Sequence, residues 1–195
     1  MIRRFIVITL AIIIWSCSSS KKENKDHLVF RYNEHKNIGS LDPAFAKDNA
    51  DIWAVNQLFN GLVEMDDSLN VIPSIAKRWD ISSDGLQYTF TLKNNVYFHK
   101  HKLFKNNTRA VKAQDFEYSF NRILDPKLAS SGQWVFNKVK HFKAKNDSTF
   151  IIQLKQPFPA FLGLLTMKYC SVVPKEIVTH YGSYFRSNPI GTGPF

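Results

Sequence analysis

The stretch PSIAKRWDISSDGLQYTFTLKNNVYFH, residues 73–99, carries the clearest folding signal in the chain. After the tight turn SDG at residues 83–85, apolar and polar side chains alternate over residues 86–93, which gives a strand one buried face and one wet face. Two asparagines then favour another turn, and a second strand is expected over residues 96–99. We therefore predict a hairpin made of residues 86–93 and 96–99.

Helical periodicity appears on both sides of this hairpin. Residues 51–60 place apolar side chains on one helical face and are followed by Gly61, a common stop signal. Residues 112–124 have apolar side chains at positions 116, 120, 123 and 124, and Asp125-Pro126 ends that helix. Short helices are also expected after Pro73 as far as residue 79, before residue 165 and over residues 174–181, and further strands at residues 28–32, 62–65, 135–142, 149–154 and 169–173. Strands and helices intermix without strict alternation, so the predicted fold class is mixed α/β (α+β).

The composition is that of an ordinary globular protein. A length of 195 residues suits one domain or an unfinished larger one, and 16 Phe and 4 Trp can build a real core. The formal net charge of +10 could indicate nucleic acid or an anionic membrane surface as a partner. Because the lysines are scattered and no aromatic–basic motif accompanies them, we expect a generally basic soluble surface and no nucleic-acid binding.

The first residues form a targeting segment. Arg3 and Arg4 precede an apolar run of eleven residues, which is too short for a bilayer that needs about 20. The following Ser16-Cys17 resembles a bacterial lipobox, in which the Cys becomes the lipidated first residue of the mature chain. We predict a signal peptide over residues 1–16, lipidation of Cys17 and a flexible tether over residues 17–27. An ordinary signal peptide with an incidental Cys is the alternative.

The second cysteine gives a simpler expectation. Once Cys17 carries lipid, only Cys170 remains, and a single thiol cannot form an internal disulfide. Its apolar surroundings, Tyr169 and the valines that follow, predict a buried and inert thiol rather than a nucleophile.

Six blocks in order resemble a known family: SLDPAFA, LFNGLVEMD, the stretch quoted above, KAQDFEYSFNRILDP, FIIQLKQPFPAFL and NPIGTGPF. They are similar to the oligopeptide- and dipeptide-binding proteins of ABC importers (solute-binding protein family 5), from about residue 28 to residue 195. The resemblance implies a periplasmic-binding-protein-like fold of two lobes, type II and cluster C-like, with only the first lobe and its subdomain present. Residues 28–48 would begin the large lobe, 49–155 would form the subdomain and 156–195 would return to the large lobe.

Two departures from the family pattern stand out. The family has an acidic residue and Gly after the second hairpin strand, where this chain has Lys100-His101, so that turn must take another geometry. Family members are also much longer, so this sequence resembles an amino-terminal portion without the opposing jaw.

The resemblance implies a binding protein with no catalytic group and no cofactor. Its lobes would close around a peptide by a hinge, and the closed form would deliver the peptide to an ABC permease and ATPase complex. It would work as a monomer in the bacterial cell envelope, lipid-anchored and facing the periplasm or exterior. The contact positions that the resemblance and their locations suggest are Asn37, Ile38, Gly39, Ser40, Trp134, Phe136, Tyr169 and Ser171. A core role is an open alternative for Trp134 and Phe136, as burial is for Tyr169 and Ser171.

The sequence leaves other functions open. His99 and His101 stand two apart on one strand face and could ligate a metal, but no third ligand follows at a recognisable spacing, so an exposed hairpin end is expected. A cell-envelope hydrolase has no nucleophile elbow to support it. The same fold could bind a nickel complex, a sugar or another solute, and an adhesive or structural surface lipoprotein is a further alternative.

Overall fold

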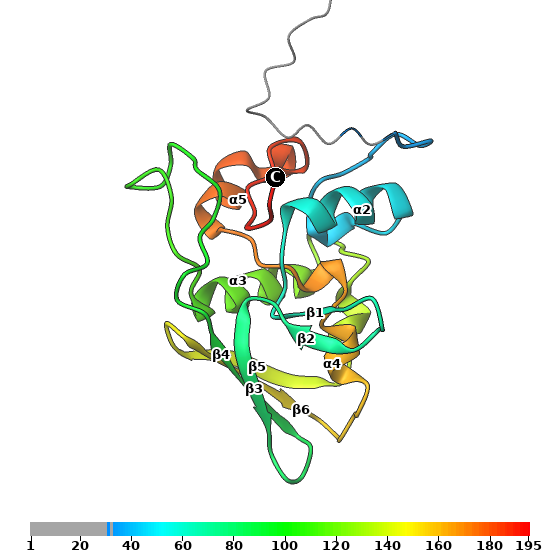
Figure 1. Ribbon diagram of the computed structural model, residues 1–195, viewed down its shortest axis with the longest axis vertical. Coiled ribbons are helices and arrows are strands. Elements are labelled where there is room, and N and C mark those ends of the chain that lie inside the picture. The colour runs from blue at the N-terminus through cyan, green and yellow to red at the C-terminus, as the bar shows by residue number, and fades with distance from the viewer. Residues whose placement is uncertain (1–30, 32) are drawn as a thin grey trace, which may run out of the picture. The chain divides into compact units, whose positions relative to one another are not determined.

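The computed structural model describes residue 31 and residues 33–195, of which residues 35–195 form one compact unit (Figure 1). The predicted signal peptide, Cys17, the tether and nearly all of the first predicted strand lie outside the described residues. Within the described residues, no helix combines the length and the apolar character that a membrane crossing requires.

Helices and strands alternate irregularly along the chain, which confirms the predicted mixed α/β class. The helices are α2 (Asn49–Leu58), α3 (Ala113–Leu124), α4 (Phe161–Leu164) and α5 (Lys175–Tyr181), with short 3-10 helices η1 (Pro43–Phe45), η2 (Gln133–Phe136), η3 (Lys168–Cys170) and η4 (Gly182–Ser187). The strands are β1 (Val63–Met65), β2 (Val71–Pro73), β3 (Ala76–Ile81), β4 (Gln87–Leu92), β5 (Val139–Asn146) and β6 (Thr149–Leu154).

An antiparallel sheet of order β3-β4-β6-β5 occupies the lower half of Figure 1, and α3 lies beside it. The predicted alternation in β4 is confirmed, because Tyr88, Phe90 and Leu92 are buried while Thr89 and Thr91 are half-buried. The strand β6 repeats the pattern with every second side chain buried. Two strands with matching buried faces therefore present one continuous apolar surface.

The helix α3 packs aromatic side chains against the β6 part of that surface and against the neighbouring strand β5. Phe120 is fully buried, and its ring centre lies 4.8 Å from that of Phe136, 5.5 Å from those of Phe142 and Phe150, and 6.0 Å from that of Phe116. These separations fall within the range in which aromatic pairs stabilise one another beyond the area that they bury. The predicted helical face is confirmed at Phe116, Phe120 and Ile123, whereas Leu124 ends the helix and is partly exposed.

The predicted hairpin was wrong in the strand that it paired with residues 86–93. Around the turn at residues 83–85, β4 pairs with β3, and residues 96–99 make only an isolated bridge between Tyr97 and Ala110. The short helix predicted after Pro73 was also wrong, since that segment is β3. As the edge strand of its sheet, β3 keeps most side chains exposed, so its sequence lacks the alternation of a half-buried strand.

The apolar run at residues 169–173 is buried but is not a strand. It contains η3 and an extended stretch in which Val172 N–H donates to the Asn60 carbonyl (3.0 Å) and Val173 N–H donates to Ser119 Oγ (2.9 Å). Cys170 is fully buried there, which confirms the predicted burial, and burial raises the pKa of its thiol.

Candidate functional site

A helix carboxylate holds the first predicted contact loop. Asp51, in the first turn of α2, accepts hydrogen bonds at one Oδ from Gly39 N–H (2.7 Å) and Ser40 N–H (3.3 Å). The Asp51 side chain is almost completely buried, whereas Asn37 and Ile38 are exposed. The loop is therefore fixed at its base and presents the two preceding side chains to solvent.

The loop continues into η1, which a buried ion pair ties to α3. Asp42 accepts two hydrogen bonds from the Arg122 guanidinium, one of them 2.8 Å long, and one from Ala44 N–H (3.1 Å). The two charged side chains are 4% and 10% exposed. Ser130 Oγ donates to the Ala44 carbonyl (2.6 Å), which brings the segment before η2 against η1.

The second group of predicted contacts divides into an exposed and a buried part. Trp134 is 47% exposed, whereas Phe136 takes the core role that its sequence position left open. Tyr169 is mostly buried against Gly132, where an added Cβ would lie 2.4 Å from Tyr169 Cγ. Ser171 is buried, and its Oγ has no hydrogen-bond partner among the described residues.

The structure thus gathers several predicted positions around η1. The loop at residues 37–40 leads into η1, Ser130 joins η1 to the segment that carries Trp134, and Tyr169 packs on that same segment through Gly132. Ile38 and Trp134 are the exposed large apolar side chains of this group. Whether they contact a solute stays a prediction.

His99 fastens the segment near the end of the chain. Its Nδ1 accepts from Gly191 N–H (3.2 Å), so its Nε2 carries the proton that it donates to the Gly193 carbonyl (2.7 Å). The interpretation of His99 as an exposed hairpin end was therefore wrong. Because both ring nitrogens are engaged, His99 has no lone pair left for a metal ion.

The loop after His99 is fixed by contacts of its own. His101 Nε2 lies 3.1 Å from Tyr181 Oη, and burial, together with the charges of Lys102 and His180, lowers the pKa of His101. No group of three or more potential metal ligands occurs among the described residues. The two histidines therefore point to different partners.

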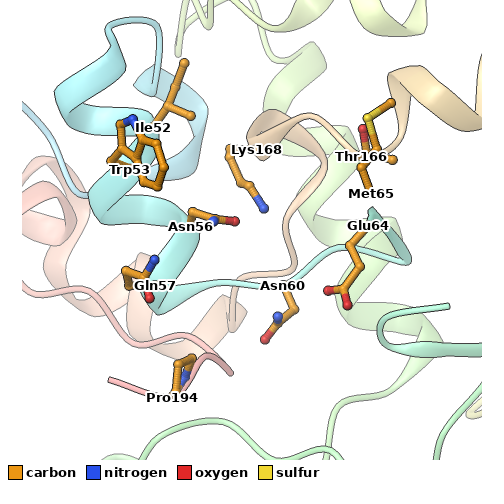
Figure 2. Close-up of a pocket in the computed structure, with 10 residues that line it drawn as sticks. All are labelled: Ile52, Trp53, Asn56, Gln57, Asn60, Glu64, Met65, Thr166, Lys168 and Pro194. Atoms are coloured by element: carbon orange, nitrogen blue, oxygen red, sulfur yellow. The ribbon is translucent and has the colours of Figure 1, made fainter. Parts of the chain in front are cut away.

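A hollow with a cavity volume of about 530 Å³ lies between α2, β1 and η3, and Figure 2 shows its walls. Its lining residues are Ile52, Trp53, Asn56, Gln57, Asn60, Glu64, Met65, Thr166, Lys168 and Pro194. None of the eight predicted contact residues lines it, so sequence reasoning missed it. The available signal was one face of α2, where Trp53, Asn56 and Gln57 follow one another at helical spacing.

Comparison with known proteins gives a consistent result. The profile of a family described as "Bacterial extracellular solute-binding proteins, family 5 Middle" matches residues 70–195. A "Probable di/tripeptide-binding protein 5" of Pseudomonas aeruginosa is 36% identical over 155 residues, which are 71% of this chain and 29% of that protein.

Solved structures agree with this match. The DppA periplasmic binding protein of Helicobacter pylori, in complex with the peptide STSA, has a TM-score of 0.72 and 31% identity, over 80% of this chain and 34% of its own. NikZ of Campylobacter jejuni, in complex with Ni(L-His), has a TM-score of 0.69 and 33% identity, over 82% of this chain and 30% of its own.

The chain spans about a third of the length of these relatives. Its mixed α/β unit has the fold of the corresponding part of family 5 periplasmic binding proteins. Since the family profile covers most of the sequence and a structure of the same family matches four fifths of it, this chain belongs to the bacterial extracellular solute-binding proteins of family 5.

Proposed function

We propose that this chain contributes the solute-binding part of an ABC importer and captures short peptides outside the cytoplasmic membrane of a bacterium. The proposal rests most on the fit of 80% of the chain to a peptide-bound binding protein with a TM-score of 0.72. The relative named as a di/tripeptide-binding protein supports the same solute class.

The surface around η1 is the proposed contact region for the peptide. Asn37, Ile38, Gly39 and Ser40 come from one loop, and Trp134 and Tyr169 from segments that pack beside η1. A fixed loop backbone can hydrogen-bond the main chain of a peptide, which all peptides share. The exposed apolar side chains beside it can contact varied peptide side chains. Phe136 and Ser171, both buried, would act only by supporting this surface.

The domain assignment is also a proposal. The sheet and α3 run from Ala76 to Leu154, within the residues 49–155 that we assign to the subdomain. Residues 28–48 and 156–195 would belong to the larger lobe, and closure of the lobes would favour recognition by the permease.

A nickel complex is the second candidate solute. The similarity to NikZ in complex with Ni(L-His), at 33% identity, favours it. The described residues gather no cluster of metal ligands, so they would contact such a complex through its organic part rather than through the metal.

Membrane attachment through lipid on Cys17 completes the proposal, supported by the apolar run and Ser16-Cys17 in the sequence. A bacterial strain that requires one amino acid and lacks this protein is expected to grow poorly when that amino acid comes only in a dipeptide or tripeptide. It is expected to grow normally on the free amino acid, and the wild-type gene should restore growth on peptides. Unchanged growth of the deletion strain on peptides would contradict the importer role.

In the same strain, the Cys17→Ala variant separates anchoring from binding. Without the thiol no thioether-linked lipid can form, so the variant is expected to leave the membrane fraction and to restore growth on peptides only weakly. Immunoblots of membrane and non-membrane fractions check this, with Cys170→Ala as the matched control because that thiol is buried. A Cys17→Ala protein that stays in the membrane fraction would contradict lipid anchoring but leave solute binding open.

A further inference from the structure

Lys168 carries a positive charge in the hollow beside α2 without a bonded counter-charge. Its side chain is half-buried, and Figure 2 shows its ammonium directed into the hollow toward Asn56. Among the described residues, no hydrogen bond or salt bridge reaches Lys168 Nζ. Burial lowers the pKa of Lys168, an effect that the Glu64 charge opposes. An ammonium that loses water without gaining a partner is costly, so this group is suited to meet an anion from outside the chain.

The neighbouring side chains of α2 offer further donors. The amides of Asn56 and Gln57 line the hollow and have no hydrogen-bond partner in the part of the chain that the structure describes. Each amide NH₂ can donate two hydrogen bonds, and the ammonium can donate three. Trp53, which is 56% exposed, forms an apolar wall beside these donors.

A second charge limits which anions fit. Glu64 lines the same hollow, where Ser74 Oγ donates to its Oε2 (2.8 Å). The carboxylate of Glu64 repels a second negative charge, which disfavours phosphate and other dianions. A singly charged carboxylate beside an apolar group meets the ammonium, the amides and the Trp53 wall together.

We infer that this hollow is a subsite for a carboxylate group of a small organic solute, bound by Lys168 with Asn56 and Gln57 as additional donors. The side chains that line the hollow support this subsite on their own. Only the biological source of the carboxylate, the free carboxyl end of a peptide, rests on the proposed function. Acetate carries the same group without a peptide, so it distinguishes a peptide end from any organic acid.

The test is an NMR titration of the 195-residue chain labelled with ¹³C-lysine, in which the Lys168 ε-CH₂ signal is assigned by its loss in Lys168→Met. N-acetyl-Ala-Ala with a free carboxyl group is expected to shift this signal and to raise the pKa of Lys168, since an anion stabilises the charged form. The amide-capped peptide should leave the signal in place. Asn56→Leu is expected to weaken the titration about tenfold, the size of one lost hydrogen bond to a charged group.

Controls make the result specific. In Lys140→Met, which removes an exposed strand lysine outside the hollow, the Lys168 titration should be unchanged. If acetate shifts the Lys168 signal at the same concentration as the peptide, the subsite binds organic acids in general. The assignment of the bound group to a peptide end would then be wrong. An equal shift with the capped peptide, no shift with either peptide, or tighter binding of phosphate would overturn the inference. If cells still require the protein for peptide uptake while the titration is silent, the importer role stands and the subsite falls.

Discussion

The Arg122→Met variant is expected to lose about 3–5 kcal/mol of unfolding free energy, because it leaves the Asp42 carboxylate buried without its counter-charge. Arg122 and Asp42 are 10% and 4% exposed, so water cannot replace the lost hydrogen bonds. Urea unfolding followed by tryptophan fluorescence measures the change. The variant should also loosen η1, which this ion pair joins to α3.

Two comparisons check this explanation. Arg78→Met, on the exposed edge strand β3, should change stability by no more than about 0.5 kcal/mol. Adding Asp42→Asn to Arg122→Met should recover part of the loss, since the unpaired charge is gone. If Arg122→Met costs no more than Arg78→Met, the buried pair does not hold η1 in place.

Gly191→Ala should cost about 3 kcal/mol, at the upper end of the usual range for overpacking. A Cβ at this position would lie 1.9 Å from the Leu58 carbonyl oxygen and 2.8 Å from Phe59 Cδ1. The neighbouring amides of Thr192 and Gly193 donate to that carbonyl at 3.0 and 2.9 Å, so the segment cannot move away without breaking these bonds.

Gly163→Ala is the matched control, again with urea unfolding as the measurement. Its Cβ would meet only Met65 Cε at 3.9 Å, and Ala favours the helix α4 over Gly, so stability should stay equal or rise slightly. A Gly191→Ala variant as stable as Gly163→Ala would mean that the close approach to α2 is unimportant.

The sequence predicted the elements whose side-chain pattern follows one buried face. The helix α3 has Phe116, Phe120 and Ile123 on one side and Pro126 after its end, so its position and its buried face were both predictable. The strand β4 alternates cleanly because only one face of its sheet is buried, with Tyr88 on that face packing against Phe161.

Elements outside that pattern could not be predicted in the same way. The edge strand β3 is exposed over most of its length, so its sequence shows no alternation that would mark a strand. In the absence of that pattern, Pro73 was interpreted as the start of a helix. The run at residues 169–173 is apolar because it is buried, yet its backbone bonds go to Asn60 and Ser119 rather than to a strand. Burial alone does not distinguish these conformations.

The same limit applies to the candidate sites. The loop at residues 37–40 was predicted by resemblance, but its fixation by Asp51 depends on a packing that no spacing reveals. The hollow around Lys168 joins three elements that are distant in the sequence, α2, β1 and η3. The sequence therefore does not show that these side chains line one hollow.

Native mass spectrometry of the protein as its cells make it, purified without denaturation, tests solute binding most directly. The account predicts a series of protein masses increased by those of intact short peptides, which disappears after unfolding and refolding in peptide-free buffer. A single adduct of non-peptide mass, or protein that never carries a peptide even after incubation with a dipeptide and tripeptide mixture, would contradict it.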